Sequence, residues 1–225
     1  MGRGEWLAER RAAVERNYTL EAPTYDEGYD PVTPEHLRFV TRLIDTCPSA
    51  GTVLDAACGT GTYVGMVLVA GRHLVGADQS DGMLAEARSK HPEVRFERIG
   101  LQELAFDREF DAAMCTDAME NVPPEDWPRV LGNLRRAVRP GGHVYLTVEE
   151  IERRELASAF EEATVAGLPS VYGEMVVGDT AGYHYYPDRD RVQGWLSEAG
   201  FGVVDDADEW LDGYGYHHLL VRAPD

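Results

Sequence analysis

The chain is poor in cysteine. It has three cysteines among 225 residues, and no two of them form a CxxC pair. This spacing provides neither a disulfide framework nor a cysteine zinc site. No apolar segment with a small-residue cleavage site lies near Met1, so we expect no secretory leader and a cytoplasmic protein.

Basic residues are also scarce. The sequence has 21 Lys and Arg against 40 Asp and Glu, which gives a formal net charge of -19. Because clustered positive charge binds phosphate backbones and anionic membranes, the composition argues against nucleic acid or membrane as a partner. No apolar run approaches the roughly 18 residues needed to span a bilayer. We therefore expect a small-molecule partner, while the oligomeric state stays open between monomer and homodimer.

The chain does contain a regular alternation of strands and helices. Strand patterns lie at 53–56, 73–77, 94–99, 110–115 and 143–148, and helical patterns lie between them at 63–70, 82–90 and 127–138. Strands and helices that alternate over short links form a parallel sheet with helices on both faces. The expected fold class is α/β, with a doubly wound sheet.

The flanking segments complete a single domain over residues 1–225. Residues 1–50 form a helical extension, with helices at 5–16 and from Pro34, before the core at 51–148. A polar helix at 151–166 and an irregular Gly- and Tyr-rich stretch at 170–186 form a lid over 149–187, inserted after strand five. A helix at 188–199 and strands at 201–204 and 216–221 complete the C-terminal part, 188–225. Because no helical pattern separates the last two strands, they pair antiparallel. The sequence thus predicts a mostly parallel, seven-stranded sheet with an antiparallel last strand.

The stretch "TVLDAACGTGTYVG", residues 52–65, joins a buried strand to a turn of small side chains. Such a turn lets a ligand approach the backbone at the carboxyl end of the strand. A dinucleotide motif GxGxxG starting at Gly59 would need a third glycine at position 64, which is Val64. The sequence therefore argues against a dinucleotide-binding turn.

Two acids follow the first two strands. Asp55 at the first strand's tip would repel phosphate but would accept hydrogen bonds from an ammonium group, which suggests a ligand with an amino-acid part. Asp78, in "LVGADQS", stands where an acid typically holds ribose hydroxyls. An amino acid joined to a nucleoside describes S-adenosylmethionine.

Four segments in order, "VLDAACGTG", "VGADQS", "FDAAMCTDAMENV" and "LRRAVRPGGHVYLTV", resemble the class I (Rossmann-like) S-adenosylmethionine-dependent methyltransferases. The resemblance is strong over residues 52–148 and looser in "LSEAGF". It implies that the methionine part of the cofactor lies against Asp55, Gly59, Gly61 and the backbone of Ala57. It further implies that Asp78 binds the ribose and that adenine lies along Gln79 and Met83 and against Leu101 and Gln102.

Methyl transfer from a sulfonium is an in-line displacement, so the protein aligns the nucleophile, excludes water and accepts a proton. The resemblance places the end of the fourth strand, with Asp117, Glu120 and Asn121, beside the reactive methyl. The spacing DxxEN is similar to an ExxEH metal-binding pattern of some members of the superfamily, with two of three ligands altered. Glu120 is therefore a candidate general base, with a metal ligand and a solvated helix-start acid as alternatives. We expect no metal.

Two segments outside the core are candidates to close the site. By resemblance the N-terminal "PTYDEGYD" folds over the cofactor through Tyr25 and Tyr29. The lid segment "YGEMVVGDTAGYHYYP" concentrates aromatic and titratable side chains, of which His184 is the candidate catalytic base. His217 and His218 lie on opposite faces of one strand and are expected to be structural.

The sequence thus predicts an S-adenosylmethionine-dependent methyltransferase for a small-molecule acceptor, with Glu120 and His184 as catalytic candidates. The alternative is a non-catalytic protein that binds S-adenosylmethionine or S-adenosylhomocysteine as a sensor or complex subunit. The polar residues around the transfer site favour the enzyme. The sequence leaves open whether the acceptor atom is oxygen, nitrogen or carbon.

Overall fold

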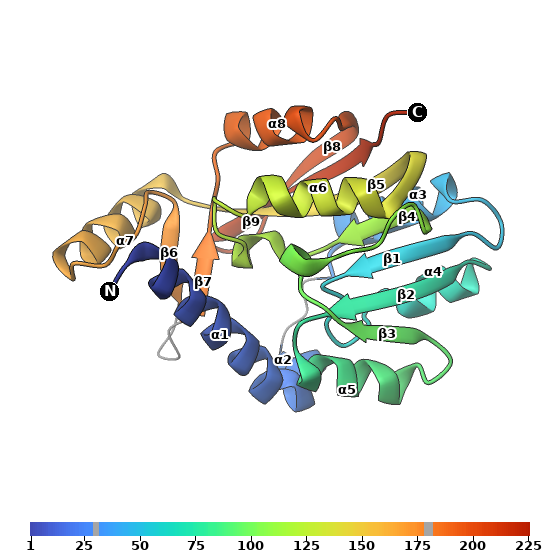
Figure 1. Cartoon of the computed structure of the whole chain (residues 1–225), viewed down its shortest axis with the longest axis horizontal. Helices are drawn as coiled ribbons and strands as arrows, with labels where there is room; N and C mark the ends of the chain where they lie inside the picture. Colours follow the sequence, from blue (N-terminus) through green and yellow to red (C-terminus); the bar gives the residue numbers. More distant parts are fainter. Residues whose placement is uncertain (29–31, 178–181) are drawn as a thin grey trace.

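The computed structural model describes residues 1–28, 32–177 and 182–225, which are built around one seven-stranded sheet (Figure 1). The strand order is β3-β2-β1-β4-β5-β9-β8. Strands β1 to β5 pair in parallel, and β9 runs antiparallel to both neighbours. The predicted doubly wound sheet with an antiparallel last strand is confirmed. Its strands are β1 (Thr52–Ala56), β2 (His73–Asp78), β3 (Arg95–Arg98), β4 (Phe110–Cys115), β5 (Val138–Ile151), β8 (Gly202–Trp210) and β9 (Tyr214–Arg222).

Helices cover both faces of the sheet because successive strand residues point to opposite sides. Leu54 belongs to the core under one set of helices, and its neighbour Val53 to the core under the other. The first set is α1 (Arg3–Glu21), α6 (Trp127–Ala137) and α8 (Arg189–Glu198), and the second is α3 (Pro34–Thr46), α4 (Val64–Val69) and α5 (Asp81–Lys90).

Side-chain caps fix where three of these helices begin. The Thr33 hydroxyl accepts a hydrogen bond from the His36 amide at 3.3 Å, and Pro34 occupies the first turn of α3. Ser80 accepts from the Met83 amide at 3.2 Å to start α5, and Asp188 from the Arg191 amide at 2.8 Å to start α8. Each cap satisfies an amide that the helix itself leaves without a partner.

Three segments differ from the expectation. The N-terminal helix expected at 5–16 spans Arg3–Glu21 and continues through η1 (Ala22–Thr24) into the short helix α2 (Tyr25–Gly28), where a loop was expected. The stretch 170–186, expected to be irregular, contains a hairpin of β6 (Glu174–Val177) and β7 (Gly182–Tyr185). The fifth strand, expected at 143–148, spans Val138–Ile151, and Gly141 and Gly142 lie in a bulge near its start, where the register with β4 shifts.

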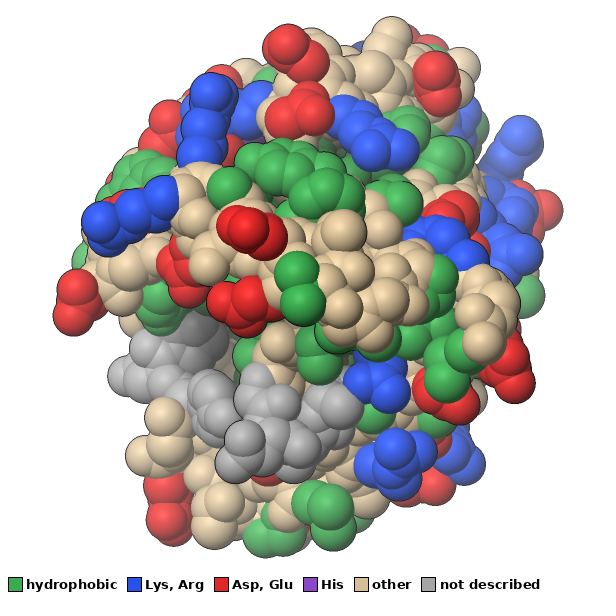
Figure 2. Space-filling model, turned by 90° about the vertical axis from the view of Figure 1, so that its left-hand side faces the viewer, with side chains coloured by type: hydrophobic (Ala, Val, Ile, Leu, Met, Phe, Trp, Pro, Cys, Tyr) green, Lys and Arg blue, Asp and Glu red, His purple; other side chains and the backbone are tan. Residues whose placement is uncertain are grey.

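The lid consists of α7 (Arg153–Val165) and the β6–β7 hairpin, and α1 packs against it (Figure 1). Figure 2 looks onto this side of the molecule, where hydrophobic, acidic and basic side chains are interspersed. Helix α7 has no buried residue, so the lid packs on the rest of the protein through the hairpin rather than through α7.

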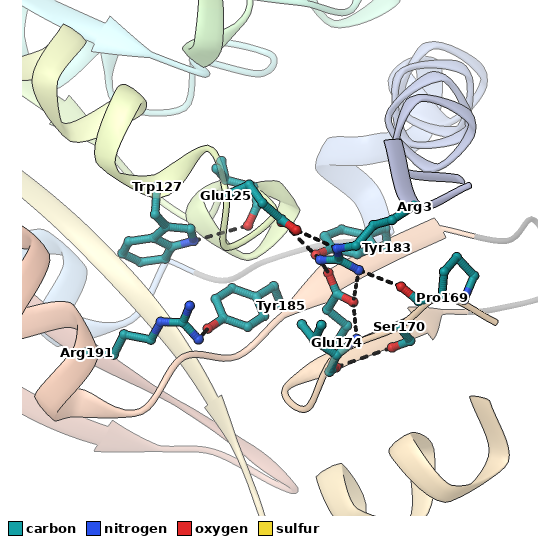
Figure 3. A network of polar contacts seen from close by, with 11 residues as sticks. Arg3, Glu125, Trp127, Pro169, Ser170, Glu174, Tyr183, Tyr185 and Arg191 are labelled. Carbon is teal, nitrogen blue, oxygen red and sulfur yellow. Dashed lines mark hydrogen bonds and ion pairs between the residues drawn. The ribbon is translucent and has the colours of Figure 1, made fainter. Parts of the chain in front are cut away.

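An ion-pair network fastens the hairpin to α1 (Figure 3). The Arg3 guanidinium donates to both carboxylate oxygens of buried Glu174, at 2.7 and 3.0 Å, and it also pairs with Glu125. The Tyr183 hydroxyl donates to Glu174 at 2.6 Å, and the Tyr183 ring meets Trp6 edge-on at 5.9 Å. These contacts between residues far apart in sequence thus hold the lid hairpin against α1.

Candidate active site

A cavity of about 390 Å³ opens at the carboxyl ends of β1, β2 and β4. Parallel sheets of this kind place ligands at that edge. Nearly all the residues predicted to contact the cofactor line this cavity: Tyr25, Asp55, Ala57, Gly59, Asp78, Gln79, Met83, Leu101, Gln102 and Asp117. Gly61, Glu120 and His184 are not among its lining residues. Tyr29 lies outside the described residues.

The turn after β1 bends through three residues with positive φ. These are Ala57 at 62°, Gly59 at 52° and Gly61 at 85°. A Cβ added to Gly59 would meet nothing within 4 Å, so this backbone faces open space. A Cβ on Gly61 would come within 3.2 Å of Val64 and 3.3 Å of the His91 ring. Gly59 therefore allows close approach of a ligand, whereas Gly61 allows the turn to pack on α4 and on the end of α5.

Asp55 is buried at the tip of β1, and its Oδ2 has no hydrogen-bond partner among the described residues. Burial, with the charge of nearby Asp78, raises the Asp55 pKa to about 7. A buried carboxylate without a partner is costly unless a donor or a cation reaches it. Asp55 thus suits the ammonium group of an amino-acid ligand, as the sequence predicted.

Asp78 is held by the backbone at the tip of β2. Its Oδ2 accepts from the Gly59 amide at 3.0 Å and its Oδ1 from the Ser80 amide at 2.7 Å. Burial raises the Asp78 pKa while these amides oppose the rise. Since each carboxylate oxygen has a second lone pair, the oriented group can still accept from two vicinal hydroxyls.

The part of the cavity lined by Met83, Leu101 and Gln102, here called the slot, is where the sequence predicts adenine. Met83 on α5 and Leu101 on η2 (Leu101–Glu103) are buried there beside Gln102. The Asn133 side chain holds the slot from behind, donating to the Leu101 carbonyl at 2.9 Å and the Gln102 carbonyl at 3.1 Å. This arrangement fits adenine, an apolar ring with polar edges.

Helix α1 contributes lining residues that the sequence reasoning missed, namely Arg11, Val14 and Tyr18. Arg11 pairs with Glu103, at 2.8 Å for the longer of two contacts, and donates to Gln79 at 3.4 Å. Val14 and Tyr18 are spaced by about one helical turn, which indicates that both lie on one face of α1. This spacing alone does not indicate what that face packs against.

The short helix α2 and the turn after β1 are linked across the cavity. The Thr60 hydroxyl donates to Asp26 at 2.5 Å, and Lys90 pairs with the other Asp26 oxygen at 2.7 Å. The neighbouring Tyr25 lines the cavity and lies 6.1 Å from the Tyr18 ring, between ring centroids. The N-terminal extension thus caps this site, as the family resemblance implied.

Glu120 and His184 meet beside the cavity, in a cluster that also contains Glu149 from the end of β5. One ligating atom from each residue lies within 4.8 Å of the others. Asn121, which does line the cavity, donates to Glu120 Oε1 at 2.8 Å, while Glu120 Oε2 has no partner among the described residues. His184 Nδ1 lies 2.9 Å from the Tyr186 hydroxyl and 3.5 Å from Glu149.

The three side chains of this cluster titrate far from their ordinary ranges. Burial and the charge of Glu149 raise the Glu120 pKa well above its usual value. Burial and Asp117 raise the Glu149 pKa to about 7, and burial lowers the His184 pKa to about 4. The cluster is therefore partly protonated at neutral pH, with Glu149 closest to the midpoint of its titration. Sequence reasoning missed Glu149, although an acid at the end of the fifth strand was a usable signal.

Asp117 joins the cavity to a second polar network behind it. Its φ is 50°, and its amide donates to the Thr147 hydroxyl at 2.7 Å. The Thr147 hydroxyl donates back to Asp117 Oδ1 at 3.1 Å, and His36 Nε2 lies 3.0 Å from the same oxygen. Asp117 is thus fixed in its position by three contacts.

Comparison with known proteins agrees with this geometry. A family model described as "Methyltransferase domain" matches residues 53–142. Ubiquinone/menaquinone biosynthesis C-methyltransferase UbiE of Klebsiella pneumoniae is 30% identical over 191 residues, which cover 76% of this chain and 70% of that protein. Demethylmenaquinone methyltransferase of Clavibacter sepedonicus is 29% identical over 210 residues, 88% of this chain and 81% of that protein.

Solved structures show the same fold at low identity. Magnesium protoporphyrin IX methyltransferase from Synechocystis, with bound S-adenosylhomocysteine, gives a TM-score of 0.69 at 17% identity, over 95% of this chain and 99% of that one. The 1,6-didemethyltoxoflavin-N1-methyltransferase of Burkholderia thailandensis gives 0.68 at 19% identity, over 97% and 90% of the two chains.

The fold and the cavity are those of a class I S-adenosylmethionine-dependent methyltransferase. The chain belongs to this family and is an enzyme that transfers a methyl group from S-adenosylmethionine to a small molecule. The catalytic prediction is thereby favoured over the sensor alternative. No helix in the described part of the chain is long and apolar enough to cross a membrane.

Proposed function

We propose that the enzyme methylates a ring carbon of a hydroxylated aromatic acceptor of the hydroquinone class. The observation that carries this proposal is the cluster of buried Glu120 with the partly exposed Glu149 and His184 beside the cavity. Carbon methylation of such a ring requires a hydroxyl proton to leave, and the cluster offers carboxyl groups able to receive it. The names of the relatives, which are quinone-biosynthesis methyltransferases, support the same acceptor class.

Cofactor binding in this proposal uses the residues that line the cavity. Asp55 receives the ammonium group, Asp78 the two ribose hydroxyls, and the slot of Met83, Leu101 and Gln102 the adenine. The open face of Gly59 and its neighbours lies along the methionine part. The unpartnered Asp55 Oδ2 fits this assignment, because a bound ammonium supplies the missing charge and donors.

When bound, S-adenosylmethionine supplies a methyl group already activated by the positive sulfonium. Glu149, with a pKa of about 7, accepts the hydroxyl proton of the acceptor, since a base works best when its pKa lies near the working pH. Glu120 stays protonated, because two carboxyls with oxygens within 4.8 Å of each other do not readily both ionise. The ring carbon would then form its bond to the methyl group as the bond between that group and the sulfonium sulfur breaks, which leaves S-adenosylhomocysteine. The proton on that carbon would pass to water while Glu149 returns its proton to the ring oxygen.

His184 has a different role from the one expected. With its pKa lowered to about 4, His184 is a weak base near pH 7. Its neutral ring lies 2.9 Å from the Tyr186 hydroxyl through Nδ1, so it orients that tyrosine and leaves Nε2 for the acceptor. We retain His184 in the catalytic group as a hydrogen-bonding residue.

The proposal also covers the setting of the reaction. Residues 1–50 and 149–187 close a single domain over the 51–148 core. The enzyme works in the cytoplasm without nucleic acid, which its net charge of -19 would repel. It acts as a monomer or a homodimer.

The test is a methyl-transfer assay with demethylated hydroquinone acceptors in wild type, Glu149→Gln and Glu161→Gln, the last an exposed control on α7. We expect Glu149→Gln to lower kcat by about 10² to 10⁴ and to keep cofactor affinity. In wild type kcat should fall as the pH drops below about 7, since Glu149 must be ionised to accept a proton. Cofactor binding without turnover of any such acceptor would refute the acceptor class.

A further inference from the structure

A second buried cluster lies behind Asp117, on the opposite side of the sheet from the lid. It brings together His36 of α3, Glu209 of β8 and His218 of β9, and one ligating atom from each lies within 4.8 Å of the others. Both histidines are fully buried, and the Glu209 side chain is 17% exposed. None of the three lines the cofactor cavity.

One atom in this cluster lacks a partner that a buried polar atom should have. His218 Nε2 accepts and donates no hydrogen bond among the described residues, although it lies 3.5 Å from Glu209 Oε2. The ring is held by Phe39, stacked on it at 5.3 Å between centroids, and by the His36 ring, which meets it edge-on at 4.7 Å. The orphaned nitrogen is thus held pointing at a carboxylate, in a site where an unsatisfied group is costly.

The opposite nitrogen of each ring has the partner that metal-binding histidines characteristically have. His218 Nδ1 lies 2.9 Å from the Tyr145 hydroxyl, and His36 Nε2 lies 3.0 Å from Asp117 Oδ1. A histidine that binds a metal through one nitrogen usually donates its other N–H to an oxygen acceptor, often a carboxylate, and this bond fixes the ring. Both rings of the cluster show this pattern.

The remaining His36 nitrogen faces the centre of the cluster. His36 Nδ1 lies 2.8 Å from the Thr33 hydroxyl, which donates to Glu209. His36 Nδ1, His218 Nε2 and Glu209 therefore surround one point, with the Thr33 oxygen beside it.

We propose that His36, Glu209 and His218 bind a divalent transition-metal ion, with Zn²⁺ as the best chemical match. Two imidazole nitrogens and one carboxylate form a common zinc ligand set, and the Thr33 hydroxyl or a water fills the fourth tetrahedral position. The ion reaches the site past the partly exposed Glu209. It joins the start of α3 to the β8–β9 pair and holds His36 so that Nε2–H donates to Asp117 at the cofactor cavity.

No sequence motif indicates this site. His217 and His218 are adjacent, and the nearest acids in sequence have no ligand spacing. His218 was expected to be structural, and His217 does face away, with its ring 3.2 Å from Asp206. Only the fold brings α3 and β8 to the same point.

The test is a titration of the full chain, stripped with a chelator, against Zn²⁺ by calorimetry and against Co²⁺ by visible absorption. Wild type is compared with Glu209→Gln, with His217→Gln as the neighbouring control, and with Glu149→Gln as a probe of the other cluster. Melting temperatures without metal establish that each variant is folded. A stable fold is required because affinity is read only from folded protein.

We expect one ion per chain in wild type, tetrahedral Co²⁺ bands, and affinity lowered at least about tenfold in Glu209→Gln only. Zn²⁺ should also raise the melting temperature of wild type but not of Glu209→Gln. Absence of stoichiometric binding would overturn the proposal. Binding that Glu209→Gln leaves unchanged, or that is lost in Glu149→Gln instead, would overturn it as well. These readouts use no methyl acceptor, so they stand apart from the proposed reaction.

Discussion

The Asp55 carboxyl makes the stability of the cofactor-free protein depend on pH. Its pKa in the folded protein is raised to about 7 from an ordinary value of 3.8, so the folded state favours the protonated form. The contribution of this protonated carboxyl to the free energy of unfolding is fully present below pH 4 and is lost as the pH rises through 7. Asp55→Asn should remove this loss, which is at most about 4 kcal/mol for a shift of this size.

The same variant should bind S-adenosylmethionine more weakly, because an amide cannot neutralise the ammonium group. Denaturant unfolding of the cofactor-free protein from pH 5 to pH 8 measures the stability, and calorimetric titration measures the affinity. Equal pH slopes in wild type and Asp55→Asn would show that Asp55 is not protonated as inferred.

Asp78 is the residue that we propose binds the ribose hydroxyls. Asp78→Ala should weaken binding of S-adenosylhomocysteine by about 100-fold, since hydrogen bonds to a charged acceptor contribute roughly 1.5–3 kcal/mol each. Asp81→Ala, an exposed acid on the same segment that pairs with Arg98, is the matched control. Calorimetric titration of both variants decides the matter, and unchanged affinity in Asp78→Ala would exclude the assignment.

At the residue scale, the sequence predicted the part of the site that local structure forms. Asp55 and Asp78 lie at the ends of their own strands and Gly59 in the turn after the first, so the motif fixes their positions. Glu149 and Tyr18 reach the site through packing between distant elements, which a motif does not encode. Gly61 is a third case, since it is predicted as a ligand contact but does not line the cavity, and its backbone lies close to Val64 and His91.

Among the elements, the pairing of α1 with the lid hairpin depends on Arg3. Arg3→Ala would leave the buried Glu174 carboxylate without its cation, although Tyr183 still donates to it. Removing one partner of a buried pair typically costs 3–5 kcal/mol, and the partial exposure of Arg3 reduces this to roughly 2 kcal/mol. We expect faster amide exchange in α1, β6 and β7, and a melting temperature lower by about 4–8 °C.

Arg154→Ala is the control for this experiment, because Arg154 is 84% exposed and pairs with exposed Glu152. If both variants melt alike and exchange alike, the Arg3 network does not hold the lid.

The order of elements and the presence of a lid could be predicted from the sequence, but the hairpin within the lid could not. Alternating strands and helices of ordinary length specify the doubly wound sheet. The β6–β7 hairpin is short and rich in glycine and tyrosine, and its burial comes from α1, which lies at the other end of the chain. The extension of helix α1 to Glu21 was missed for a related reason, since its apolar side becomes buried only against the hairpin and the cavity.

For the molecule as a whole, cofactor binding should stabilise the fold. Asp55 and Glu120 are buried acids and Glu149 a partly exposed one in a chain of net charge -19, and a cationic ligand relieves part of that repulsion. S-adenosylmethionine at 100 times its Kd should add about 2.7 kcal/mol, which corresponds to roughly 5–10 °C in melting temperature. A thermal scan with and without ligand measures it, and the gain should be smaller in Asp78→Ala. A melting temperature that ligand leaves unchanged would contradict specific binding to the native state.

The contact of Asp26 with Thr60 and Lys90 has a consequence for the order of events in turnover. It ties the N-terminal cap to the turn along which the cofactor lies. S-adenosylhomocysteine must leave and fresh S-adenosylmethionine must enter once in every cycle, and each exchange requires the cap to open. We therefore expect compulsory-order kinetics, in which the cofactor binds first, its demethylated form leaves last, and the rate of cap opening sets the upper limit of turnover.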